Sequence, residues 1–532
     1  MHHAGEEPVR LTGTPASPGY AAGPLFHLGH AASAYAAKGT AAGEADALRS
    51  ALAEASARIG DMIANAPGEA AEILEFQLAM LEDDALAAPA FAAIEGGAAA
   101  DEAWRAVLDA EIAGYEQAED AYFRARSADL RDIRDTVLRA LAGDACPVAP
   151  PGAVLCGDDI APTLFLGTDW SKGGGVALAR GSPASHVAML ARARGVPMVV
   201  GLGDAVAGFT GLALLDAEHG GIVLGPGEDD LAAYRSSAEA FNAARLRAGE
   251  FLSRPAATRD GTAVRVLINI ADPSDVDAIE VGHCDGVGLM RTEFLFGNAL
   301  PDEETQLRAY RKVLEWAKGK PVTIRTVDAG GDKPVPGFTV AEDNPFLGQR
   351  GIRLSLARPD VFRVQIRALL RAAVHGDLKV MFPMVAVPDE YARARALFLQ
   401  EAAMLSAAGI AHRMPPLGIM VEVPSAAIMP EAFADAAFFS IGSNDLTQYV
   451  MAAARDNGSV AGLNSARNPA VLRLIAGVAA FGRQHGIPVS LCGDAGGDPA
   501  AIPALLEAGL RDLSVAPAQL AAAKAAVADV SL

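Results

Sequence analysis

Chemically reactive side chains stand directly after short apolar runs in the second half of the 532-residue chain. Each run has the length of a buried β-strand, and parallel strands of one sheet bring their carboxyl ends to a common edge. A single charged residue after a strand is usually a surface charge, but a recurring set is expected to converge on one site. The set consists of Arg291, Arg325, Glu422, Asn444, Asp445 and Cys492.

The arginines of this set indicate an anionic ligand. Guanidinium groups bind carboxylate and phosphate through pairs of hydrogen bonds. Arg291 and Arg325 together therefore suit a compact anion that carries several charges. Arg350, Arg455 and Lys333 are expected to add to the same cationic cluster.

The carboxylates of the set indicate a magnesium site. Glu422 and Asp445 offer hard oxygen ligands, and Mg²⁺ commonly takes one or two protein carboxylates and completes its shell with water and phosphate. Such an ion would offset the charge of a phosphate. The alternative is that these acids form only structural ion pairs with the arginines, which would leave the cysteine among them unexplained.

The thiol of Cys492 is a candidate proton donor. A cysteine with an ordinary pKa of about 8.5 can protonate a carbanion or an enolate. The alternative is a small buried apolar residue, which is the commoner role of a free cysteine.

A second reactive position lies in the sequence GSPASHVAMLARARGVP at residues 181–197. The pattern predicts a turn and then a helix that starts near Ser185 or His186, with Gly195 and Pro197 as stop signals. His186 then lies in the first helical turn, where free backbone amides and the helix dipole favour an anion and disfavour a proton. A neutral imidazole at this position is a candidate nucleophile that can carry a phosphate.

The elements that must position the first set of residues lie in residues 259–532. Short apolar runs alternate there with helix-like stretches, and eight such runs match the size and rhythm of a (β/α)8 barrel of the TIM type. An open doubly wound sheet is the alternative arrangement. In a barrel, catalytic groups project from the carboxyl ends of the strands.

The first half of the chain predicts two further structures and a connection. Residues 10–40 and 143–228 contain short apolar runs separated by glycine, which indicates one α/β domain. Residues 41–142 place apolar residues three and four positions apart, which predicts an inserted all-α subdomain of about four helices. Residues 229–258 are expected to form a long polar linker helix. The predicted fold class is therefore multidomain α/β.

The composition narrows the class of protein and its location. A formal net charge of −21 opposes nucleic acid as the main partner, and it fits either a basic protein partner or an ordinary solvated surface. The sequence has no run of about 18 apolar residues that would predict a membrane span, and no signal peptide is recognised. Four cysteines without metal-ligand spacing favour a reduced, cytoplasmic location.

Eight motifs follow one another in an order that is typical of a known family. They are ASHVAMLARARGVPMVVG, VGLMRTEFLF, IRTVDAGGDKPVP, NPFLGQRGIR, MFPMV, GIMVEVPSA, SIGSNDLTQY and LCGDAGGD. Together with TPASPGYAAGPL at residues 14–25, they make the chain resemble Enzyme I of the bacterial phosphotransferase system. The resemblance extends to about residue 517 and rests on the order and spacing of the whole set.

The resemblance implies a phosphoenolpyruvate-protein phosphotransferase. In that family a phosphoryl group passes from phosphoenolpyruvate to the position matched by His186, on the imidazole nitrogen remote from the backbone. It then passes to a histidine of a small HPr-like phosphocarrier protein, and pyruvate is released. Cys492 matches the proton donor to the enolate, and Glu422 and Asp445 match the Mg²⁺ ligands. The positions that match the binding of phosphoenolpyruvate are Arg291, Arg325, Lys333, Arg350, Asn444, Asp445 and Arg455.

The resemblance also implies roles for whole domains. Residues 41–142 match the subdomain that docks the carrier, and residues 259–532 match the barrel that binds phosphoenolpyruvate and forms a homodimer. The α/β domain is expected to swivel between barrel and carrier. This reaction is the first step of the phosphotransferase system, which serves sugar transport in many members, whereas the pathway served by this chain stays open.

Two positions depart from the family pattern, and two alternative functions are considered beside the one that the resemblance implies. Ala184 replaces a threonine near the active histidine, and Ala454 replaces an aspartate before Arg455. One alternative is a non-catalytic or divergent regulatory relative that serves a different carrier. The other is a relative of pyruvate phosphate dikinase or phosphoenolpyruvate synthase, which would need a further nucleotide-binding domain.

Overall fold

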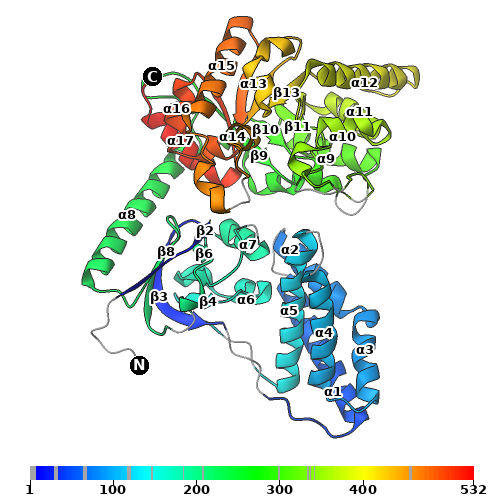
Figure 1. The fold of residues 1–532 in the computed structure, drawn as a ribbon, viewed down its shortest axis with the longest axis vertical. Helices are drawn as coiled ribbons and strands as arrows, with labels where there is room; N and C mark the ends of the chain where they lie inside the picture. Colours follow the sequence, from blue (N-terminus) through cyan, green and yellow to red (C-terminus); the bar gives the residue numbers. More distant parts are fainter. Residues whose placement is uncertain are drawn as a thin grey trace. The chain divides into compact units, whose positions relative to one another are not determined.

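A computed structural model of the chain gives its fold (Figure 1). The structure describes residues 8–28, 34–63, 69–116, 121–144, 148–183, 185–206, 209–296, 300–331, 335, 337–340, 342–454 and 458–532. The chain divides into two compact units, Met1–Asn242 and Ala243–Leu532. Each unit has hydrophobic cores of its own.

Eight parallel strands close into a barrel in the second unit, which confirms the predicted (β/α)8 fold and excludes the open sheet. The strands pair in chain order, and the first strand closes the ring by pairing with both the second and the last. They are β9 (Arg265–Ile270), β10 (Val287–Met290), β11 (Val322–Arg325), β12 (Leu378–Phe382), β13 (Leu417–Val421), β14 (Phe439–Gly442), β15 (Val489–Cys492) and β16 (Asp512–Val515).

Helices cover the outside of the barrel (Figure 1). Apolar side chains fill its interior. Outward side chains pack on the helices, as Phe439 does on Phe481, with ring centroids 6.3 Å apart. Inward side chains such as Leu289 and Met420 meet across the barrel, so a ligand site is expected at one end of it. The helices are α9 (Glu303–Trp316), α10 (Ile352–Ala357), α11 (Pro359–Ala372), α12 (Pro388–Ala407), α13 (Pro424–Ile428), α14 (Ser443–Met451), α15 (Pro469–His485), α16 (Ile502–Glu507) and α17 (Leu520–Asp529).

An eight-stranded sheet in the first unit joins segments that are far apart in sequence. Its order is β1-β8-β7-β3-β4-β5-β6-β2, with a parallel centre from β3 to β6 and antiparallel pairs toward both edges. Short helices α6 (Pro162–Gly167) and α7 (His186–Arg194) pack on one face through an apolar cluster. The strands are β1 (Val9–Thr12), β2 (Thr14–Ser17), β3 (Tyr20–His27), β4 (Val154–Gly157), β5 (Gly175–Leu178), β6 (Met198–Val200), β7 (Leu212–Asp216) and β8 (Gly221–Leu224).

The inserted all-α subdomain contains five described helices, so the expected number of about four was wrong. The periodic pattern did not reveal the break between the second and third helices, where the turn is short and Asp83 caps the new helix. Trp104 and Leu48 lie in the core that the helices share. The helices are α1 (Ala41–Ile63), α2 (Glu69–Leu81), α3 (Asp84–Glu95), α4 (Ala100–Glu116) and α5 (Ala121–Ala142).

A single long helix, α8 (Glu228–Phe251), follows the first unit's last strand and confirms that a helix forms there. It ends before the expected residue 258, because Pro255 disfavours helical backbone at the residue before it. In its first half, Tyr234 and Phe241 pack edge-on against Tyr20 of the sheet. In its second half, Arg247 forms an ion pair with Asp529 of α17. No helix in the described part of the chain combines the length and the apolar character that crossing a membrane requires.

Candidate active site

The carboxyl ends of the barrel strands bring the predicted residues to one mouth. Arg325 and Cys492 are the last residues of β11 and β15, and Arg291 and Glu422 directly follow β10 and β13. Asn444 and Asp445 lie in the first turn of α14, which begins where β14 ends. The charges of Arg291, Arg325 and Glu422 all act on the thiol of Cys492.

Arg325 is a buried cation held by two carboxylates. Its Nη2 atom lies 3.0 Å from Oε2 of Glu293, and its Nη1 atom lies 3.1 Å from Oδ2 of Asp328. Burial alone would lower the pKa of Arg325, but these carboxylates outweigh it and raise the pKa above its usual range. The Nε atom of Arg325 has no hydrogen-bond partner among the described residues, so one buried donor is left for a ligand.

Arg350 links two sides of the mouth. Its guanidinium donates to both oxygens of Asp445, at 3.0 and 3.2 Å, and to both oxygens of Asp328, at 3.1 and 3.0 Å. It also donates to the hydroxyl of Tyr449, at 3.3 Å. The side chain is 2% exposed, so this group is fixed in place.

Glu422 is a buried carboxyl among like charges. Burial, with the nearby carboxylates of Asp445 and Asp328, raises the pKa of Glu422 to about 8. The backbone N–H of Met384 donates to its Oε1 atom at 2.6 Å. Gly442 leaves room for it, because a Cβ at that position would lie 2.8 Å from Oε2 of Glu422.

The donor set at the mouth fits a Mg²⁺ ion. Three guanidinium groups stand beside four acids, those of Glu293, Asp328, Glu422 and Asp445, so ionisation of Glu422 would leave these described groups with an excess of one negative charge. A dication would oppose both the burial and the repulsion by neighbouring carboxylates that keep a proton on Glu422. The described residues contain no cluster of three or more metal-ligating side chains, so the protein share would be the two carboxylates that Mg²⁺ commonly takes.

Cys492 lies in the barrel interior and keeps its proton. Burial raises the pKa of Cys492 to about 11, although a hydrogen bond from Ser440 and the charges of Arg325 and Arg291 oppose the shift. The Oγ atom of Ser440 donates to Sγ at 3.3 Å. At neutral pH this residue is therefore a thiol, which is the form that a proton donor needs.

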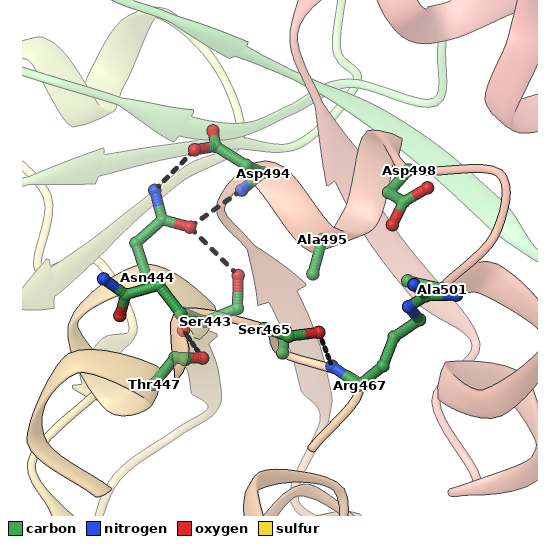
Figure 2. Close-up of a pocket in the computed structure, with 11 residues that line it drawn as sticks. Ser443, Asn444, Thr447, Ser465, Arg467, Asp494, Ala495, Asp498 and Ala501 are labelled. Atoms are coloured by element: carbon green, nitrogen blue, oxygen red, sulfur yellow. Dashed lines mark hydrogen bonds between the residues drawn. The ribbon is translucent and has the colours of Figure 1, made fainter. Parts of the chain in front are cut away.

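Asn444 lines a polar cavity of about 280 Å³ at the same end of the barrel (Figure 2). Its side-chain amide is held at both ends, because Nδ2 donates to Oδ2 of Asp494 at 3.0 Å and Oδ1 accepts from the Asp494 backbone N–H at 3.0 Å. Gly493 has a φ of +118°, and a Cβ there would lie 2.3 Å from Oγ of Ser443. The close approach of these two loops thus requires glycine.

The second predicted site lies in the first unit, and its helix is confirmed. α7 begins at His186, and the hydroxyl of Ser185 caps it by accepting from the backbone N–H of Ala188 at 3.2 Å. The helix ends at Gly195 in the left-handed conformation, as the sequence predicted. The side chain of His186 and the whole of Ala184 lie outside what the structure describes.

Two predicted residues lie outside the described residues, and three unpredicted residues join the site. Lys333 and Arg455 fall in the first group. The unpredicted residues are the acids Glu293, Asp328 and Asp494. Glu293 pairs with Arg325, and Asp328 pairs with both Arg325 and Arg350. Asp494 accepts a hydrogen bond from Asn444. These acids stand inside the motifs MRTEF, RTVDAGGDK and CGDAGGD, so the signal was present, but nothing in the sequence shows which arginine or amide an acid will meet.

Three family models match the chain along most of its length. They are the PEP-utilising enzyme, N-terminal, at residues 12–126; the PEP-utilising enzyme, mobile domain, at residues 149–220; and the PEP-utilising enzyme, PEP-binding domain, at residues 245–532. The last alone spans more than half of the chain. The chain belongs to the PEP-utilising enzymes. PEP is phosphoenolpyruvate, and the family is the one that the motifs indicated.

The sequence of this PEP-utilising enzyme is similar to those of several phosphotransferases. It is 39% identical to the phosphoenolpyruvate-protein phosphotransferase of Geobacillus stearothermophilus, over 78% of this chain and 73% of the relative. The enzyme of that name from Priestia megaterium is 37% identical, over 87% of this chain and 82% of the relative. The enzyme of that name from Listeria monocytogenes is 36% identical, over 84% of this chain and 80% of the relative.

Proposed function

We propose that this PEP-utilising enzyme transfers the phosphoryl group of PEP, through His186, to a small phosphocarrier protein and releases pyruvate. The observation that carries the proposal is the barrel mouth, where a buried arginine with a free Nε donor lies in electrostatic range of a protonated thiol. An anion gripped by arginines beside a proton donor suits a substrate that becomes an enolate. The relatives named phosphoenolpyruvate-protein phosphotransferase support the same conclusion.

Binding of PEP falls to the cationic residues of the mouth. Arg325 offers its free Nε donor, and Arg291 and Arg350 add positive charge close by. The amide of Asn444 is fixed at the cavity wall and can orient an oxygen of the substrate. We assign Lys333, Arg455 and Asp445 to the same binding set on the strength of the motifs alone.

The transfer step needs a nucleophile and a proton donor. In the proposal, Nε2 of neutral His186 forms a bond to phosphorus, and the bond from phosphorus to the enol oxygen breaks. The electron pair stays on the enolate, which takes a proton at its methylene carbon from Sγ of Cys492 and becomes pyruvate. The thiolate then regains a proton from water. His186 passes the phosphoryl group to a histidine of the carrier in a second displacement.

Glu422 and Asp445 would hold a Mg²⁺ ion in this scheme. The ion supplies positive charge that offsets the negative charge on the transferring phosphoryl group. Glu422 would have to release the proton that burial and its acidic neighbours favour. Asp445 would share its oxygens between the ion and Arg350, which already donates to both of them.

We assign the remaining tasks to whole domains. Residues 10–40 and 143–228 would carry His186, residues 41–142 would dock an HPr-like carrier, and residues 259–532 would bind PEP. Residues 229–258 would link the domains and let His186 swivel between barrel and carrier. The separate hydrophobic core of the helical subdomain supports its role as an independent docking platform. A cytoplasmic location suits such a carrier.

A homodimer through the barrel is also part of the proposal. Large apolar side chains on the barrel's outer helices, or directly after one of them, are strongly exposed, and such exposure often marks a protein interface. Four of them are Leu399, Met404, Ile428 and Met429, at 54%, 59%, 64% and 53% exposure. Sedimentation analysis checks the point, because a monomer at micromolar concentration would contradict it.

Incubation of the purified chain with PEP and Mg²⁺ tests the function. The protein should gain a phosphate that is labile in acid and stable in base, as expected of phosphohistidine. His186→Ala should abolish this gain and carrier phosphorylation while leaving PEP binding within about twofold, because His186 is not in the barrel. Lack of phosphate on folded wild-type protein would favour a non-catalytic relative, and transfer by His186→Ala would assign the phosphate to another residue.

A further inference from the structure

The two buried arginines of the barrel mouth share one carboxylate, that of Asp328. Its Oδ2 atom lies 3.1 Å from Nη1 of Arg325 and 3.0 Å from Nη2 of Arg350, and its Oδ1 atom accepts from Nε of Arg350 at 3.1 Å. The side chain of Asp328 has no exposed surface. A single acid therefore fixes the orientation of both guanidinium planes.

A second acid holds Asp328 in turn. Oε1 of Glu293 accepts from the backbone N–H of Asp328 at 2.9 Å, while Oε2 of the same carboxylate accepts from Arg325 at 3.0 Å. Glu293 thus ties the loop after β10 to the loop after β11. The result is a network of charged groups in which each link is an ion pair or a hydrogen bond to a charged group.

Glycines let the loop that carries Asp328 approach the loop that carries Arg350. The backbone N–H of Gly351 donates to the carbonyl of Ala329 at 3.1 Å. A Cβ at Gly330, where φ is +103°, would lie 2.7 Å from the carbonyl oxygen of Gln349. The close approach of these two loops brings Asp328 against Arg350. Burying an acid would not by itself require such an approach.

We infer that Asp328, supported by Glu293, is a positioning residue that presents Arg325 and Arg350 as one preoriented pair to the anionic substrate. The inference rests on the proposed function, because that function assigns both arginines to PEP. Arg325 then keeps its Nε donor free because its two Nη atoms are already engaged. Asp328 also keeps hold of Arg350 if Asp445 turns toward another partner.

Asp328→Asn tests this role, because it keeps the shape of the side chain but turns an N–H toward a guanidinium donor. Titration of the full chain with PEP and Mg²⁺ in a His186→Ala background should show a Kd raised about tenfold or more, since misplacement of about 1 Å at a binding group is that costly. In the wild-type background, KM for PEP should rise more than kcat falls. Asp360→Asn is the matched control, because Asp360 pairs with Arg358 on the surface of the same barrel. It should leave the Kd within about twofold.

A purely structural role would lower the melting temperature of Asp328→Asn without changing the Kd of the folded protein, and that result would overturn the inference. If Asp328→Asn does not fold, Glu293→Gln decides, since it loosens Asp328 and Arg325 without adding bulk. A raised Kd supports the inference, and an unchanged Kd overturns it. Absence of PEP binding by the parent chain would instead contradict the proposed function.

Discussion

Cys492 and Glu422 are acids whose burial favours the protonated form. For Cys492, with a pKa of about 11, that form suits the proposed role, because a proton donor must hold its proton until the enolate forms. For Glu422, with a pKa of about 8, it is the wrong form for a metal ligand, because Mg²⁺ needs the carboxylate. Under the proposed function, burial therefore favours the role of Cys492, whereas Glu422 would need a cation to stabilise its carboxylate form.

Cys492→Ser should slow turnover far more than it weakens binding. A serine hydroxyl is a much weaker acid than a thiol, and loss of a general acid commonly costs about 10²-fold or more in rate. Pyruvate release under steady-state conditions, with a PEP titration of the same variant, separates kcat from binding. Cys284→Ser is the control, since Cys284 is buried in the barrel's outer core. An effect mainly on KM would assign Cys492 to packing.

Glu422 should make metal-free protein less stable as pH rises. Its pKa is about 8 when folded and near the ordinary 4.5 when unfolded, so between these values the folded state binds the extra proton. Stability therefore falls as pH rises from about 5 to about 8, by up to about 1.4 kcal/mol per pH unit. The difference between wild type and Glu422→Gln in thermal unfolding isolates this slope. Equal pH profiles of the two proteins would contradict the raised pKa.

At the scale of elements, the barrel strands place each reactive residue at their carboxyl ends, and glycines decide how closely neighbouring ends approach. Gly442 ends β14 beside Glu422 of the adjacent strand end, and a Cβ there would lie 2.8 Å from the carboxylate. Gly477 lies in the middle of α15, where a Cβ would meet no atom within 4 Å. Two glycines of one unit thus have opposite requirements.

Gly442→Ala should displace Glu422 and weaken activation by Mg²⁺ about tenfold or more, the usual cost of disturbing a ligand's support. Gly477→Ala is the matched control and should leave Mg²⁺ activation unchanged while stabilising the helix by up to about 1 kcal/mol. Activity measured against Mg²⁺ concentration and thermal unfolding of both variants check these results. Normal Mg²⁺ dependence of Gly442→Ala would remove Glu422 from the metal site.

At the scale of the whole molecule, one helix belongs to both units. The first half of α8 packs on the sheet through Tyr234 and Phe241, and its second half pairs with α17 of the barrel unit through Arg247. Little of the helix between these contacts is buried, because Ala248 is its only buried residue. Each unit thus holds one end of the helix with its own contacts, which suits the swivelling that we propose for the His186 domain.

The two units should therefore unfold in two transitions, and PEP should shift only one of them. A ligand present at about 100 times its Kd stabilises the unit that binds it by about 2.7 kcal/mol. Calorimetry of His186→Ala protein with Mg²⁺, with and without PEP, measures both transitions without turnover. A single cooperative unfolding transition would contradict independent units. An equal shift of both transitions by PEP would contradict binding of PEP to one unit alone.

The sequence by itself determined the barrel, the α7 helix and the family. The eight apolar runs separated by helical stretches indicate buried strands. Ser185 and Gly195 are local signals for the start and end of a helix. Both kinds of signal can be recognised within a short stretch of sequence. The break that makes five helices in the insert was missed, because a short turn barely interrupts the apolar period.

Only the tertiary structure decided which charges meet. Asp328 lies 22 residues before Arg350 in the sequence, yet both of its carboxylate oxygens accept hydrogen bonds from the Arg350 guanidinium. The same guanidinium also donates to Asp445, which lies a further 95 residues along the chain. Such pairs depend on how loops from different strands come together at the barrel mouth, which no local pattern encodes. The pKa values of Glu422 and Cys492 follow from the same packing, because burial and neighbouring charge are properties of the folded chain.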